Sequence, residues 1–206
     1  MRNKGAEVAT YISVASIAAS ALLIMASWII AAVDADTPIR SLLSGEGIRW
    51  LLGSFVKNIS SPILVWLLLG GMAKGMWVDS GLSRELRWGS NTHSDYNRMA
   101  FNIVVILTIL MLTVLMLMPF LPHAILLSAV GTVWGSSLAA FFVPYVALIV
   151  AIDSIVYASM TGKFRSVDVV FKSACSGIAS IAHYIIMYMC VIEFIYMILW
   201  VLGAEA

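Results

Sequence analysis

The sequence predicts an all-α polytopic membrane protein with five or six membrane-inserted helices and an amphipathic interfacial helix. Apolar residues make up 62% of the 206 residues and charged residues 11%, whereas a soluble domain has about half and about a quarter. The mean hydropathy is +0.99. Several stretches reach the length of about 20 apolar residues that a helix needs to cross a hydrocarbon core of about 30 Å. The lipid bilayer is therefore the expected surrounding of this single transmembrane domain, residues 1–206.

The first crossing is expected over residues 9–33, which carry no charge. Arg2 and Lys4 lie in the preceding segment 1–8, which we expect to be cytoplasmic. A signal peptide has a similar pattern, but its apolar region is only about 7 to 15 residues long. An uncleaved anchor is therefore predicted. Its small residues suit close contact between helices; among them are Ser13, Ser16 and Ser20.

An amphipathic helix is predicted over residues 44–57, with Ser44 as its N-cap. At 100° per residue one face is apolar and comprises Ile48, Leu51, Leu52, Phe55 and Val56. The opposite face comprises Glu46, Arg49, Gly53 and Lys57. This pattern is typical of a helix in the membrane interface, with Trp50 at the level of the headgroups. The alternative is a surface helix packed on a soluble core, which this composition does not offer. Beyond it, Asn58 and Ser60 are expected to cap helix ends.

The second crossing is expected over residues 62–78, because proline is tolerated in the first turn of a helix. Gly71 and Gly75 form a GxxxG face for close helix approach. Lys74 lies near the end, where its side chain can reach the aqueous side. After a polar loop, the third crossing is expected over residues 99–120.

The block 124–161 leaves two alternatives open. It is long enough for two tight crossings, or for one crossing and a re-entrant hairpin. Pro144 is expected to interrupt any continuous helix through this block. Residues 161–173 read as a polar connector, and the last crossing is expected over residues 175–202.

The placement of lysine and arginine bears on the number of crossings. With the N-terminus inside, six crossings divide the twelve basic residues evenly between the two sides of the membrane. An even division leaves the orientation unspecified and suggests a homodimer of two oppositely oriented copies. Five crossings move the basic residues of 161–174 to the inside, which then holds nine and the outside three. The charge rule therefore favours five crossings, while hydropathy by length favours six.

The segment from Ser41 to Leu82 contains "LLSGEGIRWLL", then "VKN", an apolar crossing with glycines, and a closing "SGL". It resembles the N-terminal part of the p-aminobenzoyl-glutamate (AbgT-like) transporter family. The resemblance implies a secondary transporter with inverted repeats, re-entrant hairpins and broken helices, working as a homodimer in the bacterial inner membrane. Its solutes would be folate-breakdown products or sulfonamide-like compounds, moved with Na⁺ or H⁺. Family members are longer, and no counterpart of their paired hairpin motifs follows Leu82, so no substrate residue is transferred.

Two carboxylates lie inside predicted crossings, where an ionisable group is costly enough to need a reason. Asp153 is a candidate for binding a coupling cation or a proton; the alternative is a carboxylate that reaches interfacial water or pairs with a basic neighbour. Glu193 should be protonated or partnered at its depth. Either a proton-linked role or a structural hydrogen bond across the helix bundle would explain it.

The segment "GTVWGSS" is the best candidate for unwound backbone that exposes carbonyls to an ion or solute. Its candidate binding residues are Gly131, Thr132, Gly135, Ser136 and Ser137. The alternative is a small-residue contact between helices. His183 is a further candidate and shares a helix face with Met187 and Cys190. These soft ligands suit copper, but no second ligand set is evident, so no metal site is predicted.

The sequence carries no phosphate-binding loop, dinucleotide fingerprint, zinc-protease motif or nucleophile elbow, so an enzyme is not predicted. The net charge of +1 gives no indication of a nucleic-acid partner. Two functions remain. One is a small secondary transporter that moves an aromatic anionic solute as a homodimer. The other is a non-transporting membrane scaffold or accessory subunit.

Overall fold

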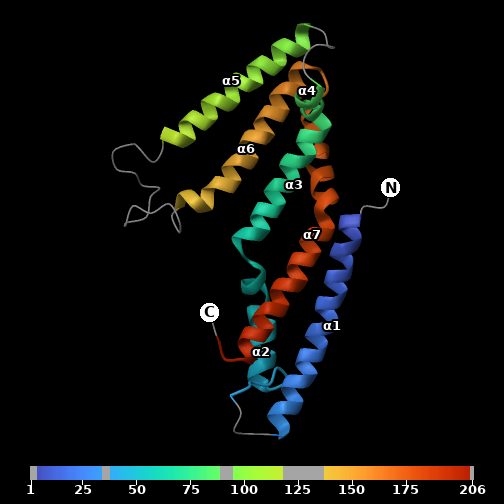
Figure 1. Ribbon diagram of the computed structural model, residues 1–206, viewed down its shortest axis with the longest axis vertical. Helices are drawn as coiled ribbons and strands as arrows, with labels where there is room; N and C mark the ends of the chain where they lie inside the picture. Colours follow the sequence, from blue (N-terminus) through green and yellow to red (C-terminus); the bar gives the residue numbers. More distant parts are fainter. Residues whose placement is uncertain (1–3, 34–37, 89–94, 118–136, 205–206) are drawn as a thin grey trace. The chain divides into compact units, whose positions relative to one another are not determined.

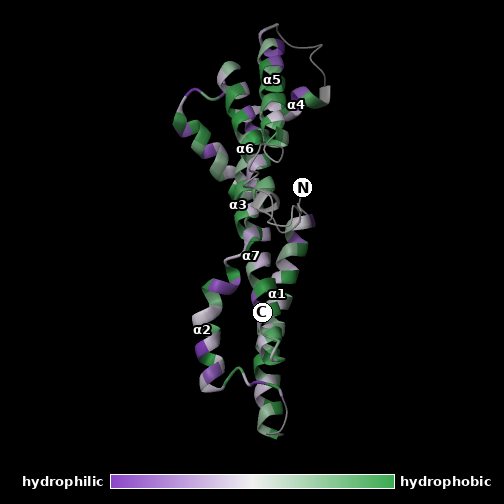
Figure 2. Ribbon diagram, turned by 90° about the vertical axis from the view of Figure 1, so that its left-hand side faces the viewer, coloured by the Kyte–Doolittle hydropathy of each residue, from purple (hydrophilic) through white to green (hydrophobic). Residues whose placement is uncertain are grey.

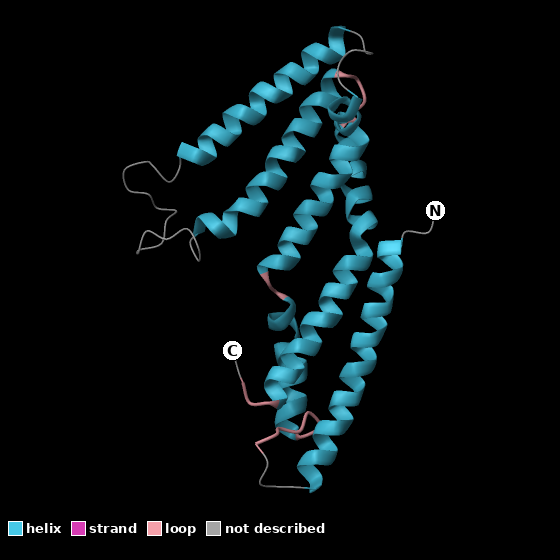
Figure 3. Cartoon of the chain, in the orientation of Figure 1, coloured by secondary structure: helices cyan, strands magenta, loops and turns pink. Residues whose placement is uncertain are grey.

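The computed structural model describes residues 4–33, 38–88, 95–117 and 137–204, and the regular structure in these ranges is entirely α-helical (Figure 3). Five of its helices are long and apolar enough to cross a membrane, namely α1, α3, α5, α6 and α7. The predicted all-α class agrees with this finding, in which only the described residues are counted. In chain order the helices are α1 (Lys4–Val33), α2 (Gly45–Ile59), α3 (Pro62–Ser80), α4 (Leu82–Trp88), α5 (Asp95–Leu117), α6 (Ser137–Met160) and α7 (Val167–Val201).

The last helix begins earlier than the sequence suggested. We expected a connector up to residue 173, but α7 starts at Val167. Asp168 lies in its first turn, where a negative charge is favourable. Its carboxylate accepts from the Lys172 ammonium at 2.7 Å, an i,i+4 pair that supports the added turn.

The block 124–161 contributes one described helix, α6. The prediction that Pro144 interrupts the helix was wrong, because α6 continues through it. A proline removes one backbone hydrogen bond, but the rest of the ladder is kept, and in apolar surroundings a helix is the way to satisfy the backbone. Residues 118–136, where the re-entrant hairpin was expected to begin, lie outside the described residues.

The chain forms two compact units, which are described separately. Unit 1 comprises Met1–Leu64 and Ala182–Ala206, and unit 2 comprises Val65–Ile181. Unit 1 therefore contains α1, α2 and the C-terminal half of α7. Unit 2 contains most of α3, then α4, α5, α6 and the N-terminal half of α7 (Figure 1).

In unit 1 the segment before α2 packs on the C-terminal end of α7. The Arg40 N–H donates to the Val201 carbonyl oxygen at 3.0 Å, and the Leu42 N–H donates to Ser27 Oγ of α1 at 3.2 Å. A buried apolar cluster surrounds these bonds and consists of Leu42, Met197, Trp200 and Val201. The start of α2 and the end of α7 therefore lie at the same end of unit 1.

Helix α2 begins as predicted, with Ser44 Oγ accepting from the Gly47 N–H at 3.0 Å. Trp50 of α2 stacks on Trp200 of α7, with ring centroids 5.3 Å apart. Asn58, further along α2, contacts Glu193, which precedes Trp200 on α7. These two contacts show that α2 runs antiparallel alongside the C-terminal part of α7.

Most of the apolar face of α2 is exposed, although Leu51 packs against the buried cluster of unit 1. Its exposed side chains include Leu52, 75% exposed, and Val56, 72% exposed. The charged side chains of α2 are exposed as well, and Figure 2 shows both kinds of residue along this helix. A surface helix packed by its apolar face on a soluble core would have buried these side chains.

In unit 2 the predicted GxxxG face makes the predicted close contact. A Cβ atom on Gly75 would lie 2.6 Å from Gly177 Cα of α7, and one on Gly71 would meet the side chain of Ile181. Helices α3 and α7 can approach this closely only where neither carries a side chain.

The connections before α4 and after α6 meet in unit 2. Lys163 Nζ donates to the Ser80 carbonyl oxygen at 2.6 Å, and Leu82 packs with Tyr157 in a buried cluster. Burial lowers the pKa of Lys163 below its ordinary value, and the charge of Arg84 lowers it further, although Glu85 opposes the shift. The residues that follow α3 and those that follow α6 therefore lie at the same end of unit 2.

Candidate functional site

The helical structure is interrupted between α2, which ends at Ile59, and α3, which begins at Pro62. The Ser60 N–H and its Oγ both bond to the Val56 carbonyl oxygen and close the end of α2. Pro62 has no N–H, so the helical ladder cannot continue through it. Ser61 Oγ accepts from the Ile63 N–H at 3.2 Å and caps the start of α3. Two serines before a proline thus produce two capped helix ends.

Helix α7 presents two polar side chains to this break. The Tyr188 hydroxyl forms a hydrogen bond with Ser61 Oγ. Asn58, only 7% exposed, donates from Nδ2 to Glu193 Oε2 at 3.4 Å. Glu193 Oε1 is buried and has no hydrogen-bond partner within the described residues. The structural hydrogen bond considered for Glu193 is therefore present, and one carboxylate oxygen remains for an ion or a proton.

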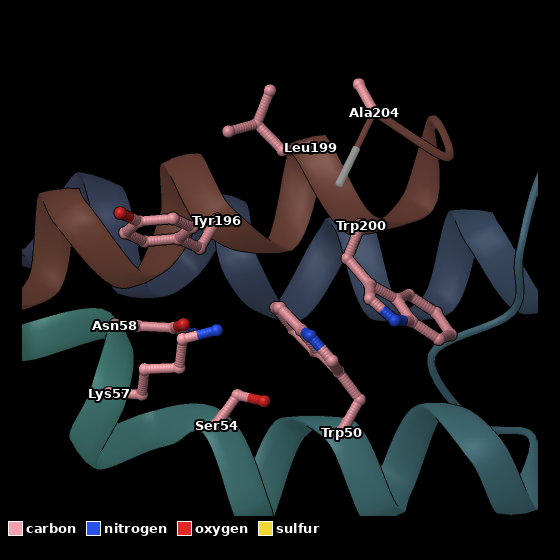
Figure 4. A pocket seen from close by; sticks show the side chains of 8 residues that line it. All are labelled: Trp50, Ser54, Lys57, Asn58, Tyr196, Leu199, Trp200 and Ala204. Atoms are coloured by element: carbon pink, nitrogen blue, oxygen red, sulfur yellow. The ribbon is translucent and has the colours of Figure 1, made fainter. Parts of the chain in front are cut away.

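A pocket of about 400 Å³ opens between α2 and the end of α7 (Figure 4). Its aromatic lining is the stacked pair Trp50 and Trp200, with Tyr196 beside them. Its polar lining comes from α2 and comprises Ser54, Lys57 and Asn58. The volume lies in the range of about 300–1,000 Å³ that small-molecule sites occupy. Aromatic faces and one ammonium group suit a planar ring that carries a negative charge.

Asn58 connects the pocket to Glu193. It lines the pocket and also donates to the half-buried carboxylate of Glu193. A ligand that draws the Asn58 amide toward itself would weaken the only hydrogen bond that the described residues give Glu193. Pocket occupancy and the state of the carboxylate are thus linked through one side chain.

The second predicted carboxylate, Asp153, belongs to unit 2. It is 4% exposed, and its Oδ2 accepts from the Thr108 hydroxyl at 2.6 Å. Its Oδ1 is buried without a hydrogen-bond partner in the part of the chain that the structure describes. The predicted alternative was a carboxylate that reaches interfacial water, but the Asp153 side chain is buried among protein residues.

One further predicted residue, His183, lines neither pocket. His183 is exposed on α7, and the described ranges contain no group of three histidine, cysteine or acidic residues that could hold a metal ion. Ser137 is the first residue of α6. The other members of the segment lie outside the described residues, namely Gly131, Thr132, Gly135 and Ser136.

The sequence reading missed several members of the site. Asn58 was expected to cap a helix end, but Ser60 caps α2 and Asn58 turns toward α7. Lys57 was assigned to a polar helix face and Trp50 to the headgroup level, and both line the pocket. The signal available was "NISSP", in which serines and a proline mark a break between two helical stretches. Tyr196 and Trp200, the aromatic partners on α7, had no such signal.

Comparisons with protein-family models, with curated proteins and with solved structures find no match for this chain. The resemblance of residues 41–82 to the AbgT-like transporters therefore stays a prediction from the residues quoted above.

Proposed function

We propose that the chain is a small multi-pass protein of the bacterial inner membrane that moves an aromatic anion across the bilayer, with Na⁺ or H⁺ bound at Glu193 as the coupling ion. One observation carries this proposal. The pocket of stacked indoles and Lys57 shares Asn58 with the half-buried Glu193, whose buried Oε1 has no partner among the described residues.

The contacts within each unit support five crossings. Arg40 bonds to Val201, so an even number of crossings separates these residues if the long helices span the bilayer. Ser80 bonds to Lys163, which requires an even number between them too. The described helices supply four and two crossings respectively. A sixth crossing in the block 124–161 would make both numbers odd.

Five crossings also favour one orientation. They place nine basic residues on the side of the N-terminus and three on the other side, and the positive-inside rule then puts the N-terminus in the cytoplasm. With five crossings the basic residues are not divided evenly between the two sides of the membrane. The reason for expecting a homodimer of two oppositely oriented copies therefore no longer holds. A homodimer of parallel copies, implied by the resemblance, stays part of the proposal.

The chemistry of the pocket supports an aromatic anion as the solute. A ring can lie against Trp50 or Tyr196, because aromatic pairs prefer offset or tilted stacking. A carboxylate on the ring can accept from Lys57, in a charge-assisted hydrogen bond that is about twice as strong as a neutral one. Asn58 and Ser54 supply further donors. p-Aminobenzoate combines these features and belongs to the solute class that the resemblance implies.

The broken helix supports ion coupling. Discontinuous helices place helix ends beside ion and substrate sites in many secondary transporters, and here the break carries Ser61, with Tyr188 and Glu193 facing it from α7. A cation or proton at Glu193 Oε1 would neutralise the carboxylate, which is costly to keep ionised in an apolar environment.

Replacing Lys57 tests the pocket. We expect Lys57→Gln to weaken p-aminobenzoate binding about tenfold, because the ring contacts remain while the charge-assisted bond is lost. The measurement is quenching of tryptophan fluorescence by p-aminobenzoate in detergent. Arg49→Gln is the matched control, since it removes the same charge from the same exposed helix but does not line the pocket.

Equal affinities of Lys57→Gln and Arg49→Gln would remove the pocket from the proposal. If p-aminobenzoate, p-aminobenzoyl-glutamate and a sulfonamide all fail to bind the wild-type chain and are not moved by it in vesicles, a scaffold or accessory subunit becomes the better explanation.

A further inference from the structure

A second pocket, in unit 2, lies between α5 and α6 and has a volume of about 400 Å³. Trp77 and Leu82 line one part of it, and Phe101 lines another. All of its lining side chains are apolar or aromatic except Thr108 and Asp153. Its chemistry is therefore opposite to that of the α2–α7 pocket, which offers an ammonium group.

Asp153 gives this pocket a single polar anchor. The residue is 96% buried, being 4% exposed, and one of its oxygens is held by the Thr108 hydroxyl. The other oxygen, Oδ1, has no hydrogen-bond partner among the described residues. A buried acceptor without a donor costs free energy, and a carboxylate in apolar surroundings costs more. A ligand that brings a donor with a positive charge would remove both costs.

We propose that this pocket binds a hydrophobic amine, with its ammonium group on Asp153 Oδ1 and its apolar body against the aromatic and aliphatic walls. An ammonium donates to Oδ1 and neutralises the carboxylate, while Thr108 keeps its bond to Oδ2. The rings of Trp77 and Phe101 add surfaces that favour a cation. A carboxylate ligand would be repelled.

A bare metal cation fits this pocket less well. Hard cations such as Ca²⁺ and Mg²⁺ take about six or more oxygen ligands, and only two lining side chains carry oxygen. The coupling-cation role first considered for Asp153 is thus less well supported than an organic cation. The inference does not depend on the proposed transport of an aromatic anion.

The test compares three probes that carry a phenyl ring on a four-carbon chain with different end groups, 4-phenylbutylamine, 4-phenylbutanol and 4-phenylbutyrate. Binding to the full chain in detergent is measured by calorimetry. We expect the amine to bind at least about tenfold more tightly than the alcohol and the butyrate not to bind at this site. Asp153→Asn should lower the affinity for the amine at least about tenfold, and Glu193→Gln should leave it unchanged.

A pocket-filling variant keeps the test decisive if Asp153→Asn does not fold. Ile109 lines the pocket and is 59% exposed, whereas its neighbour Leu110 is 57% exposed and does not line it. Ile109→Trp should abolish amine binding, and Leu110→Trp should not. Retained binding in Ile109→Trp, or equal binding of amine and alcohol as expected for a pocket that holds lipid chains, would overturn the inference.

Discussion

Gly75→Leu is expected to destabilise the protein strongly, while Gly70→Leu on the same helix is not. A Cβ atom at position 75 would lie 2.6 Å from backbone atoms of Gly177, whereas nothing lies within 4 Å of one at position 70. Both changes gain roughly 0.8–1 kcal/mol of helix propensity, so their difference isolates the overpacking. Overpacking typically costs about 1–3 kcal/mol and occasionally more, and backbone atoms cannot rotate away.

Unfolding in mixed detergent, followed by circular dichroism, measures this difference in the free energy of unfolding. Gly177→Leu, the reciprocal change on α7, should behave as Gly75→Leu does. If Gly75→Leu is as stable as Gly70→Leu, helices α3 and α7 do not cross at these glycines.

Glu193→Gln is expected to abolish accumulation of the solute against a gradient while leaving exchange intact. Glutamine keeps an oxygen that can accept from Asn58 Nδ2, but it cannot bind a proton or neutralise a cation. We expect net accumulation of p-aminobenzoate in proteoliposomes to fall at least about tenfold, a change of about 1.4 kcal/mol in the coupled step.

The experiment imposes a proton or sodium gradient, one at a time, and also measures exchange of labelled for unlabelled solute without a gradient. Glu46→Gln is the control, because it removes an exposed carboxylate from the same unit. Gradient-driven accumulation in Glu193→Gln at the wild-type level would exclude Glu193 as the coupling residue. Loss of exchange together with accumulation would indicate a structural role instead.

Most of the long apolar helices and several of their local signals could be predicted from the sequence. Long apolar stretches with few charges give the five apolar helices, Ser44 caps α2, Pro62 is the first residue of α3, and Gly75 marks the close helix contact. Each of these depends on residues a few positions apart, whose interactions are governed by helical geometry. The contact at Gly75 could be predicted without knowing which helix it meets, because a residue without a side chain already indicates a close helix approach.

The candidate site could be predicted only in part. Glu193 stood out because a carboxylate in an apolar stretch is costly, but its partner Asn58 is 135 positions away, and no spacing rule connects them. The packing of α2 alongside α7 had no signal in the sequence for a similar reason. An amphipathic pattern fits a helix in the interface, and it fits equally a helix that presents Trp50 and Lys57 to α7 as pocket walls.

The most direct test of the five-crossing architecture, on which both pockets depend, is the side of the membrane that three exposed positions face. In a chain with Cys175 and Cys190 replaced by serine, single cysteines are introduced as Gly45→Cys, Ser166→Cys and Ala204→Cys. Intact cells are then treated with a membrane-impermeant maleimide. We predict labelling of Gly45→Cys and Ala204→Cys from outside, and labelling of Ser166→Cys only after permeabilisation. Labelling of Gly45→Cys and Ala204→Cys from opposite sides would require an odd number of crossings between them and would contradict the account.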